Sequence, residues 1–166
     1  TLKIANNDKT RQQVYEIAAQ RITRYTEPQY IGDDMLRGYA DEITARDIYS
    51  ATRAPVQEVG FITSDALGFT MGYSPDGIVG DDGLIECKSR RQKYQVQTIS
   101  DGVVPDEYVL QLQTGLLITG RKWIDFISYS GGLPMFVQRV LPDADVQAAI
   151  VTAATEFEAR VVQVIR

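Results

Sequence analysis

The sequence predicts an α/β fold in which a central mixed β-sheet is flanked by helices. Apolar residues recur at helical spacing towards both ends of the chain, whereas short runs of β-branched and aromatic residues occupy its middle. Each predicted helix has one apolar face, which suits packing against a sheet. With 166 residues, of which 44% are hydrophobic, the chain is expected to form one domain, residues 1–166, with a full core.

Four helices are predicted from apolar residues that repeat every three to four positions. The first begins at an N-cap, either Asp8 or Thr10, and the third begins near Pro105, with acidic residues in its first turn. The predicted helices cover residues 8–24, 34–49, 105–119 and 142–166.

Strands are predicted where extended apolar segments lie between turn residues. Residues 58–63 and 67–73 are joined by a turn at residues 64–66, and residues 123–129 and 134–140 follow later in the chain. Residues 89–95 are polar and basic, and we interpret them as a loop.

A β-hairpin is predicted around Asp82-Gly83, since Asp-Gly favours the tight turns that join antiparallel strands. The apolar residues on either side of the turn then face each other, and Asp76 lies beside residues 87–89. Because side chains alternate along a strand, Glu86 and Lys88 share one face, while Ile85 and Cys87 occupy the other. The hairpin therefore brings two carboxylates and one ammonium group into a small area.

Carboxylate oxygens suit hard cations such as Mg²⁺ or Mn²⁺, and a lysine beside them can orient or deprotonate a water molecule. Asp76, Glu86 and Lys88 are therefore candidates for a metal-dependent site. The alternative is a solvated hairpin tip with a chance ion pair, which the residue types alone do not exclude.

Composition removes several classes of chemistry. The chain has no histidine and one cysteine, which excludes Ser-His-Asp and Cys-His catalysis, histidine-ligated zinc and an internal disulfide. No segment approaches the roughly 20 apolar residues of a membrane span, and we expect a soluble intracellular protein. The net charge of −5 disfavours a general nucleic-acid binder, although basic residues can still line a local groove.

The order of these residues resembles a known nuclease signature. Ser74-Pro75-Asp76-Gly77 followed by Glu86-Cys87-Lys88 is similar to the phage lambda exonuclease-like (viral recombinase) branch of the PD-(D/E)xK nuclease superfamily. Two flanking patterns strengthen the resemblance. Arg37-Gly38 is followed by Glu42 and Ala45, and Tyr108 is followed by Gln111 and Gln113, in the order found in that family.

The resemblance implies a restriction-endonuclease-like core and a role for each matching residue. Asp76 and Glu86, with the main-chain carbonyl of Cys87 and with Glu42, would hold one or two Mg²⁺ or Mn²⁺ ions. Lys88 would position or deprotonate the attacking water. Two further residues, Gln111 as a support of the site and Asp41 as the carboxylate that competes with Glu42, complete this set.

DNA contacts are expected from basic and hydroxyl side chains near the site. For the basic residues, the alternative is an exposed, solvated loop. The family's N-terminal segment, with an Arg and a Thr-Ala-Ser-like motif, would precede Thr1, so residues 1–166 are expected to form a nuclease domain that lacks part of it. The candidate phosphate-binding residues are Ser74, Arg37, Arg90, Arg91 and Lys93.

The resemblance further implies a metal-dependent exonuclease that degrades one strand of double-stranded DNA from its 5′ end during phage or prophage recombination. It implies DNA ends as substrate, a homotrimer, a single-strand annealing protein as partner, no membrane association and a place in the cytoplasm of a bacterial host. Two alternatives remain open at this point: an endonuclease of restriction or repair type, and a non-catalytic module that binds DNA ends.

Overall fold

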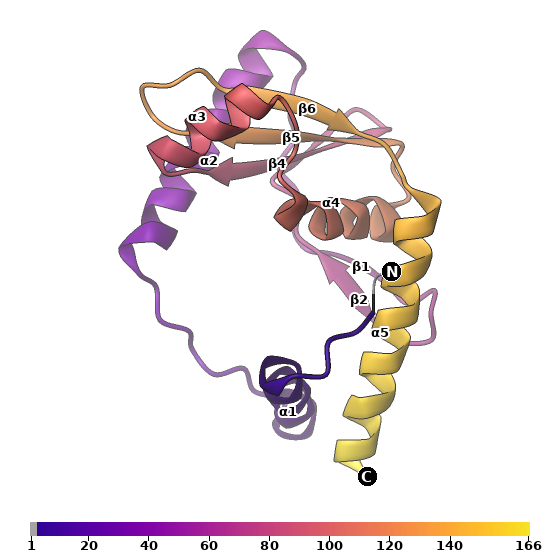
Figure 1. The fold of residues 1–166 in the computed structure, drawn as a ribbon. Coiled ribbons are helices and arrows are strands. Elements are labelled where there is room, and N and C mark those ends of the chain that lie inside the picture. Colours follow the sequence, from indigo (N-terminus) through magenta and orange to yellow (C-terminus); the bar gives the residue numbers. More distant parts are fainter. Residues whose placement is uncertain (1–2) are drawn as a thin grey trace.

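A computed structural model describes residues 3–166 and contains two β-sheets and five helices in that range. Figure 1 shows the elements in chain order. The helices are α1 (Asp8–Thr23), α2 (Asp33–Thr52), α3 (Gln92–Asp101), α4 (Asp106–Thr119) and α5 (Ala144–Ile165). The strands are β1 (Ile62–Ser64), β2 (Met71–Tyr73), β3 (Gly77–Val79), β4 (Gly83–Ser89), β5 (Trp123–Tyr129) and β6 (Phe136–Val140).

The main sheet has the strand order β3-β4-β5-β6 and is mixed, as predicted. β4 and β5 run parallel, with Gly83 opposite Trp123, and the other two pairs are antiparallel. A parallel pair needs a crossover, and α3 and α4 provide it between β4 and β5. β1 and β2 form a separate two-stranded sheet that contacts α4.

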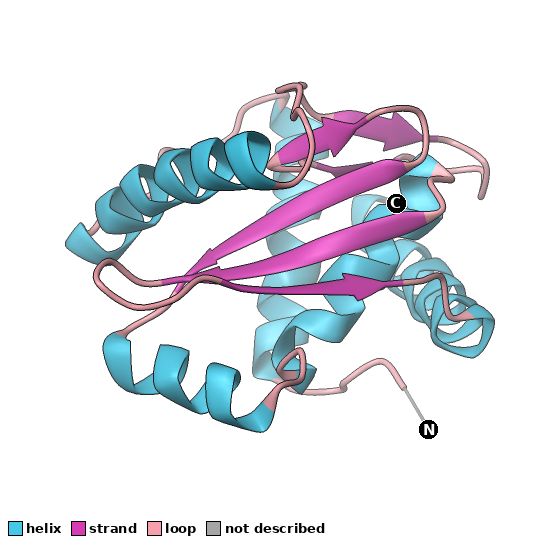
Figure 2. Ribbon diagram, turned by 90° about the horizontal axis from the view of Figure 1, so that it is seen from above, coloured by secondary structure: helices cyan, strands magenta, loops and turns pink. Residues whose placement is uncertain are grey.

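Helices lie on both sides of the main sheet (Figure 2). On one face, Leu84 and Phe126 pack in a core with Leu112 and Leu116 of α4. On the other face, Ile85, Cys87 and Ile127 pack with Ala45 and Tyr49 of α2. Alternate residues of β4 therefore point towards α4 and towards α2, which determines which side chains meet beside the sheet.

The hairpin between β3 and β4 was predicted, but its turn differs in detail. Ile78 pairs with Leu84, and residues 80–82 form a three-residue turn. Gly80 takes the left-handed conformation (φ 54°) that the turn requires. Gly83, which we had assigned to the turn, instead lies in β4, where a β-carbon would come within 2.2 Å of the ring of Trp123.

α1 lies beside α5, away from the main sheet, and residues 24–32 connect it to α2 without regular structure (Figure 1). Val14 and Ala18 of α1 form a small buried cluster with Val161 of α5. The Arg21 guanidinium donates two hydrogen bonds to the Glu158 carboxylate, at 2.6 and 2.7 Å. The N-cap of α1 is Asn7, which accepts from the Thr10 N–H, rather than Asp8 or Thr10.

Other predictions were wrong in part. Residues 89–95 are not one loop, because Ser89 ends β4 and α3 begins at Gln92. β1 is restricted to Ile62–Ser64 and β2 to Met71–Tyr73, so both are shorter than predicted, and Gln57 instead bridges to Ile78 of β3 in the main sheet. Among residues 3–166, no helix is both long enough and apolar enough to span a membrane.

Candidate active site

A cavity of about 290 Å³ lies between the first half of α2 and the end of β4. Asp76, Glu86 and Lys88 all line it, together with Cys87, so the hairpin does bring these residues to one place. Glu42 is on the α2 side of the same cavity. The remaining lining residues are Asp34, Met35, Gly38, Tyr39 and Ser89.

Glu86 is the most extensively hydrogen-bonded carboxylate of the cavity. It points towards α4 from the middle of β4 and is only 3% exposed. Its Oε1 accepts from Lys88 Nζ at 2.7 Å and from Gln111 Nε2 at 2.6 Å, while its Oε2 accepts from the Tyr73 hydroxyl. Hydrogen bonds to a charged acceptor are stronger than those to a neutral one, so these donors fix the carboxylate in one orientation.

Asp76 lies just before β3 and points at the backbone of β4. Its Oδ2 accepts a hydrogen bond from the Cys87 N–H at 2.6 Å. Burial, and then the negative charge of Glu86, raise the pKa of Asp76 from 3.8 to about 7, although the Cys87 N–H opposes the shift. The Asp76 and Glu86 carboxylates therefore repel each other when both are ionised, and a cation between them would reduce this repulsion.

Glu42 and Asp41 are adjacent residues of α2, but their carboxylates have different partners. Glu42 lines the cavity and forms an ion pair with Arg46 at 2.9 Å. Asp41 accepts from the Ser89 hydroxyl instead. Of the two carboxylates left open by the sequence, Glu42 is the one that faces Asp76 and Glu86 in this arrangement.

Cys87 presents its backbone, rather than its thiol, to Asp76. The side chain is 8% exposed and packs in the core beneath α2. Burial, and then the charge of Asp76, raise the pKa of the thiol well above its ordinary value, so it remains protonated. Within residues 3–166, no three Asp, Glu, Cys or His side chains are grouped tightly enough to hold a metal. A metal here would thus need oxygen ligands besides the carboxylates of the cavity, such as the main-chain carbonyl of Cys87.

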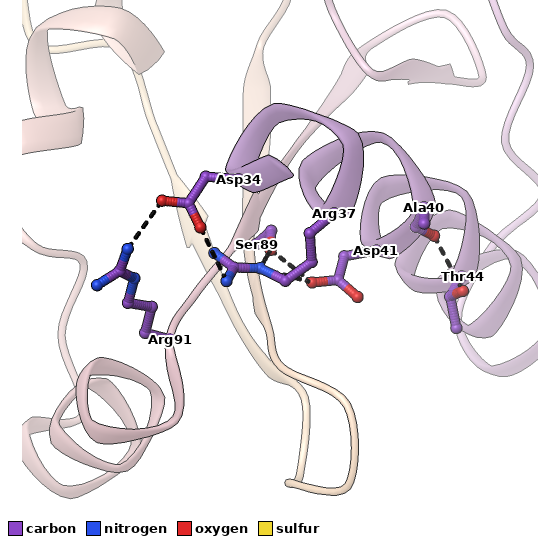
Figure 3. Close-up of polar contacts among 7 residues, drawn as sticks. All are labelled: Asp34, Arg37, Ala40, Asp41, Thr44, Ser89 and Arg91. Carbon is purple, nitrogen blue, oxygen red and sulfur yellow. Dashed lines mark hydrogen bonds and ion pairs between the residues drawn. The ribbon is translucent and has the colours of Figure 1, made fainter. Parts of the chain in front are cut away.

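Two of the predicted phosphate-binding residues meet at the N-terminal end of α2 (Figure 3). Arg91 donates to Asp34 at 2.8 Å, and Arg37 forms an ion pair with the same carboxylate at 3.1 Å. Arg37 also donates to the Ser89 hydroxyl at 3.3 Å. Both guanidinium groups therefore lie at the rim of the cavity, and both are substantially exposed.

The other predicted phosphate-binding residues lie elsewhere. Arg90 is largely buried between α3 and α4, where it donates to Glu107 at 2.7 Å and to the Tyr108 hydroxyl, and it lines a separate cavity of about 360 Å³. Lys93 is exposed on α3, and Ser74 is exposed after β2. The structure therefore groups Arg37 and Arg91 with the carboxylates, and separates Arg90 from them.

Two residues of the site were missed from the sequence. Arg46 follows Glu42 by one helical turn and also donates to the Asp76 carbonyl at 3.1 Å, so an i, i+4 Glu-Arg pair was an available signal. Tyr73 is 5% exposed, and its burial, followed by the charge of Glu86, raises the pKa of its hydroxyl far above the ordinary value. The hydroxyl thus stays protonated and donates to Glu86. No local pattern indicated this contact.

Comparison with solved structures finds similar proteins above 30% identity. An alkaline exonuclease, LHK-Exo, from Laribacter hongkongensis is 34% identical to this chain with a TM-score of 0.80, and the match covers 97% of this chain and 86% of that one. The same enzyme in complex with dAMP gives 33% identity and a TM-score of 0.81, over 96% and 85% of the two chains.

A phage-related exonuclease from Haemophilus somnus 129PT shares the fold, with 14% identity, a TM-score of 0.61 and coverage of 96% of this chain and 85% of that one. No curated protein sequence matches the chain. The model of the YqaJ-like viral recombinase domain matches residues 3–122, which include α2, the hairpin and α4. The chain therefore belongs to the YqaJ-like viral recombinase domain family.

Proposed function

We propose that this protein is a DNA exonuclease of phage type that requires a divalent cation and degrades one strand of duplex DNA from its 5′ end. The observation that carries the proposal is the arrangement of Glu86, which is buried, accepts three hydrogen bonds and lies beside Asp76 in a cavity that also contains Lys88. Membership of the family and similarity to LHK-Exo support the same reaction class.

The donor set fits a hard cation. Asp76 and Glu86 supply carboxylate oxygens, the Cys87 carbonyl is a neutral oxygen, and Glu42 adds a further carboxylate on the α2 side. Burial, and then the negative charge of Glu86, raise the pKa of Asp76, so a bound cation would favour its ionised form. Mg²⁺ is our proposed ion, with Mn²⁺ as a substitute, and when bound it would supply positive charge to the scissile phosphate and lower the pKa of a water molecule.

Side chains of the protein would orient the water, transfer the proton and bind the DNA phosphates. Lys88 is held 2.7 Å from Glu86, so its ammonium group can orient the attacking water, and in its neutral amine form Nζ can accept the proton that the water loses. Gln111 Nε2 donates to the same Glu86 oxygen, Oε1, and helps to hold it in place. Arg37 and Arg91 at the rim provide two planar guanidinium groups that can exchange Asp34 for DNA phosphates.

Several finer features rest on the family resemblance alone. These are the 5′-to-3′ polarity, a ring-shaped homotrimer, a single-strand annealing protein as partner, action in phage or prophage recombination and location in the cytoplasm of a bacterial host. The same resemblance gives Ser74, Arg90 and Lys93 as further phosphate contacts, whereas the geometry favours Arg37 and Arg91 for the contacts nearest to the carboxylates.

The deciding experiment digests linear duplexes labelled at either the 5′ or the 3′ end, with and without a 5′-phosphate, in Mg²⁺ and in chelator. We expect mononucleotide release from the 5′-labelled end in Mg²⁺ alone. A closed circular duplex is the control. Nicking of the circle would identify an endonuclease, and DNA binding without cleavage in Mg²⁺ would identify a non-catalytic end-binding module.

A further inference from the structure

Tyr73 contacts the site from outside the main sheet. It is the last residue of β2, in the small two-stranded sheet, and its ring lies in the core against α4. It does not line the cavity that contains Asp76 and Lys88. Its hydroxyl has one hydrogen-bond partner among the described residues, the Oε2 atom of Glu86.

The donors around Glu86 divide its two oxygens between different surroundings. Oε1 accepts from Lys88, which lines the cavity, and from Gln111. Oε2 accepts from Tyr73, which is buried behind the cavity. A carboxylate held by Tyr73 at one oxygen cannot rotate freely about its terminal bond, so Oε1 remains the oxygen on the side of Lys88.

α4 makes room for this contact through Gly115. A β-carbon at Gly115 would lie 2.6 Å from Cζ of Tyr73, the ring carbon that carries the hydroxyl, and 2.7 Å from Cε1. Real β-carbons do not approach other atoms so closely, so any side chain at this position would displace the Tyr73 hydroxyl. Gly115 lies one helical turn after Gln111, so the same helix orients Glu86 in two ways.

We propose that Tyr73 is a positioning residue that orients Glu86 for cation binding by holding Oε2, and that Gly115 permits this by leaving space for the Tyr73 ring. The inference rests on the proposed function, because it assigns Tyr73 a part in the same cation site. Tyr73 itself touches neither the cation nor DNA in this proposal. It acts through Glu86 only.

The test measures Mn²⁺ affinity by isothermal titration calorimetry on the full chain without DNA. Removal of a residue that orients a metal ligand typically weakens affinity by roughly 10- to 100-fold, and we expect a loss in that range for Tyr73→Phe. The cleavage rate of the variant should fall at low Mn²⁺ and recover at high Mn²⁺, with an unchanged KM for DNA. A residue with a purely structural role would not give this metal-dependent rescue.

Tyr49→Phe is a matched control. The Tyr49 hydroxyl also donates to a buried carboxylate, Asp125 Oδ2 at 2.6 Å, but on the opposite face of the sheet and outside the cavity. Both variants remove one buried hydroxyl from a carboxylate. Only Tyr73→Phe should change Mn²⁺ affinity, and equal affinity losses in the two variants would overturn the proposal.

Gly115→Ala gives a second, independent variant that retains the hydroxyl. It should weaken Mn²⁺ binding in the wild-type background but have no further effect in the Tyr73→Phe background, because Gly115 acts through the position of the Tyr73 hydroxyl, which that variant lacks. Fully additive effects would refute that link. Wild-type Mn²⁺ affinity in Tyr73→Phe would refute the role of Tyr73.

The two hypotheses fail in different ways. If Asp76→Ala and wild type bind Mn²⁺ equally weakly and neither cleaves DNA, the proposed function itself is wrong. If wild type binds Mn²⁺ in an Asp76-dependent way and cleaves DNA, while Tyr73→Phe binds Mn²⁺ as wild type does, only the role of Tyr73 is wrong.

Discussion

Replacing Asp76 by asparagine should stabilise the metal-free protein and abolish its nuclease activity. The pKa of Asp76 is raised from 3.8 to about 7 by burial and by the neighbouring Glu86, so the ionised side chain is less favourable in the fold than in the unfolded chain. Asparagine has nearly the same shape, retains an oxygen that can accept the Cys87 N–H and carries no charge. The substitution thus removes the repulsion between Asp76 and Glu86 without creating a cavity.

The magnitude follows from the same pKa. One pKa unit corresponds to about 1.4 kcal/mol, so ionised Asp76 destabilises the metal-free fold by up to about 4 kcal/mol. This figure already includes the opposing hydrogen bond from the Cys87 N–H, and relaxation of the fold and water penetration around the charge reduce it by half or more. We expect a net gain of about 1 to 2 kcal/mol, or a rise in Tm of about 2 to 8 °C.

The pH dependence has a definite sign. Because the folded pKa is above the unfolded value, Asp76 contributes no penalty below about pH 4, and its penalty grows as pH rises to about 7 and is constant above it. The advantage of Asp76→Asn over wild type should therefore increase between pH 4 and pH 7. Urea unfolding in chelator at pH 5 and at pH 8 measures it.

Added Mn²⁺ should reverse the order of stabilities. A ligand at 100 times its Kd stabilises the folded state by about 2.7 kcal/mol, and only wild type retains both carboxylates for binding. Asp125→Asn is the control, because Asp125 is paired with Tyr49 and Arg139 and should lose stability when neutralised. A less stable Asp76→Asn protein in chelator at pH 8, or one that still cleaves DNA, would refute the reasoning.

Three further predictions address the site and the sheet. Lys88→Ala should lower the single-turnover cleavage rate by about 10²- to 10⁴-fold while DNA binding is retained, since it removes the group proposed to orient the water. Near-normal digestion by this variant would exclude that role for Lys88. Arg37→Ala should weaken DNA binding without regard to sequence and reduce the slope of log K against log salt by about 1, measured by fluorescence anisotropy; an unchanged slope would remove Arg37 from the phosphate contacts. Gly83→Val should lower the free energy of unfolding, measured in urea, by about 1 to 3 kcal/mol, because a β-carbon at position 83 would come within 2.2 Å of the Trp123 ring. Unchanged stability would show that the Trp123 ring can move aside without loss of stability.

The hairpin was predictable because its determinants are local. Glycine and aspartate mark its turn, alternation assigns Glu86 and Lys88 to one face, and Asp76 is only eleven residues before the Cys87 N–H that it accepts from. The prediction was accurate in register to about one residue, because the pairing of Gly77 with Ile85 brings Asp76 level with residues 86–87 rather than 87–89. The predicted turn around Asp82-Gly83 was displaced, because Gly83 belongs to β4 and Gly80 takes the left-handed conformation.

α3 was missed because it is fixed by tertiary contacts rather than by an apolar stripe. Its buried Gln95 donates to the carbonyls of Ser128 and Pro134 and accepts from the Ser128 hydroxyl. A buried glutamine looks like a solvated one in the sequence, so the segment resembled a polar loop. The contact of Tyr73 with Glu86 was unpredictable for the same reason, since it depends on how β2 and α4 pack.

The family resemblance identified what periodicity could not. Gln111 reaches Glu86 across 25 residues of sequence, and its helix alone gives no sign of that contact. Glu42 and Asp41 were indistinguishable as helix positions, the resemblance favoured Glu42, and the fold places Glu42 in the cavity. Arg90 could not be separated from Arg91 by charge, but its partners Glu107 and Tyr108 direct it to a different cavity.

The attachment of α1 has a consequence for every stability measurement on this protein. α1 is held to α5 by a small apolar cluster and the Arg21–Glu158 pair, and it is connected to α2 by an irregular segment, so it can detach as a cooperative unit while the main sheet stays intact. If α1 detaches first, unfolding has two steps, and the free energies predicted above refer to the step in which the main sheet unfolds. Trp123, the sole tryptophan, lies in β5 next to the hairpin. Its fluorescence reports the step that dismantles the cavity, whereas far-ultraviolet circular dichroism also registers the loss of α1.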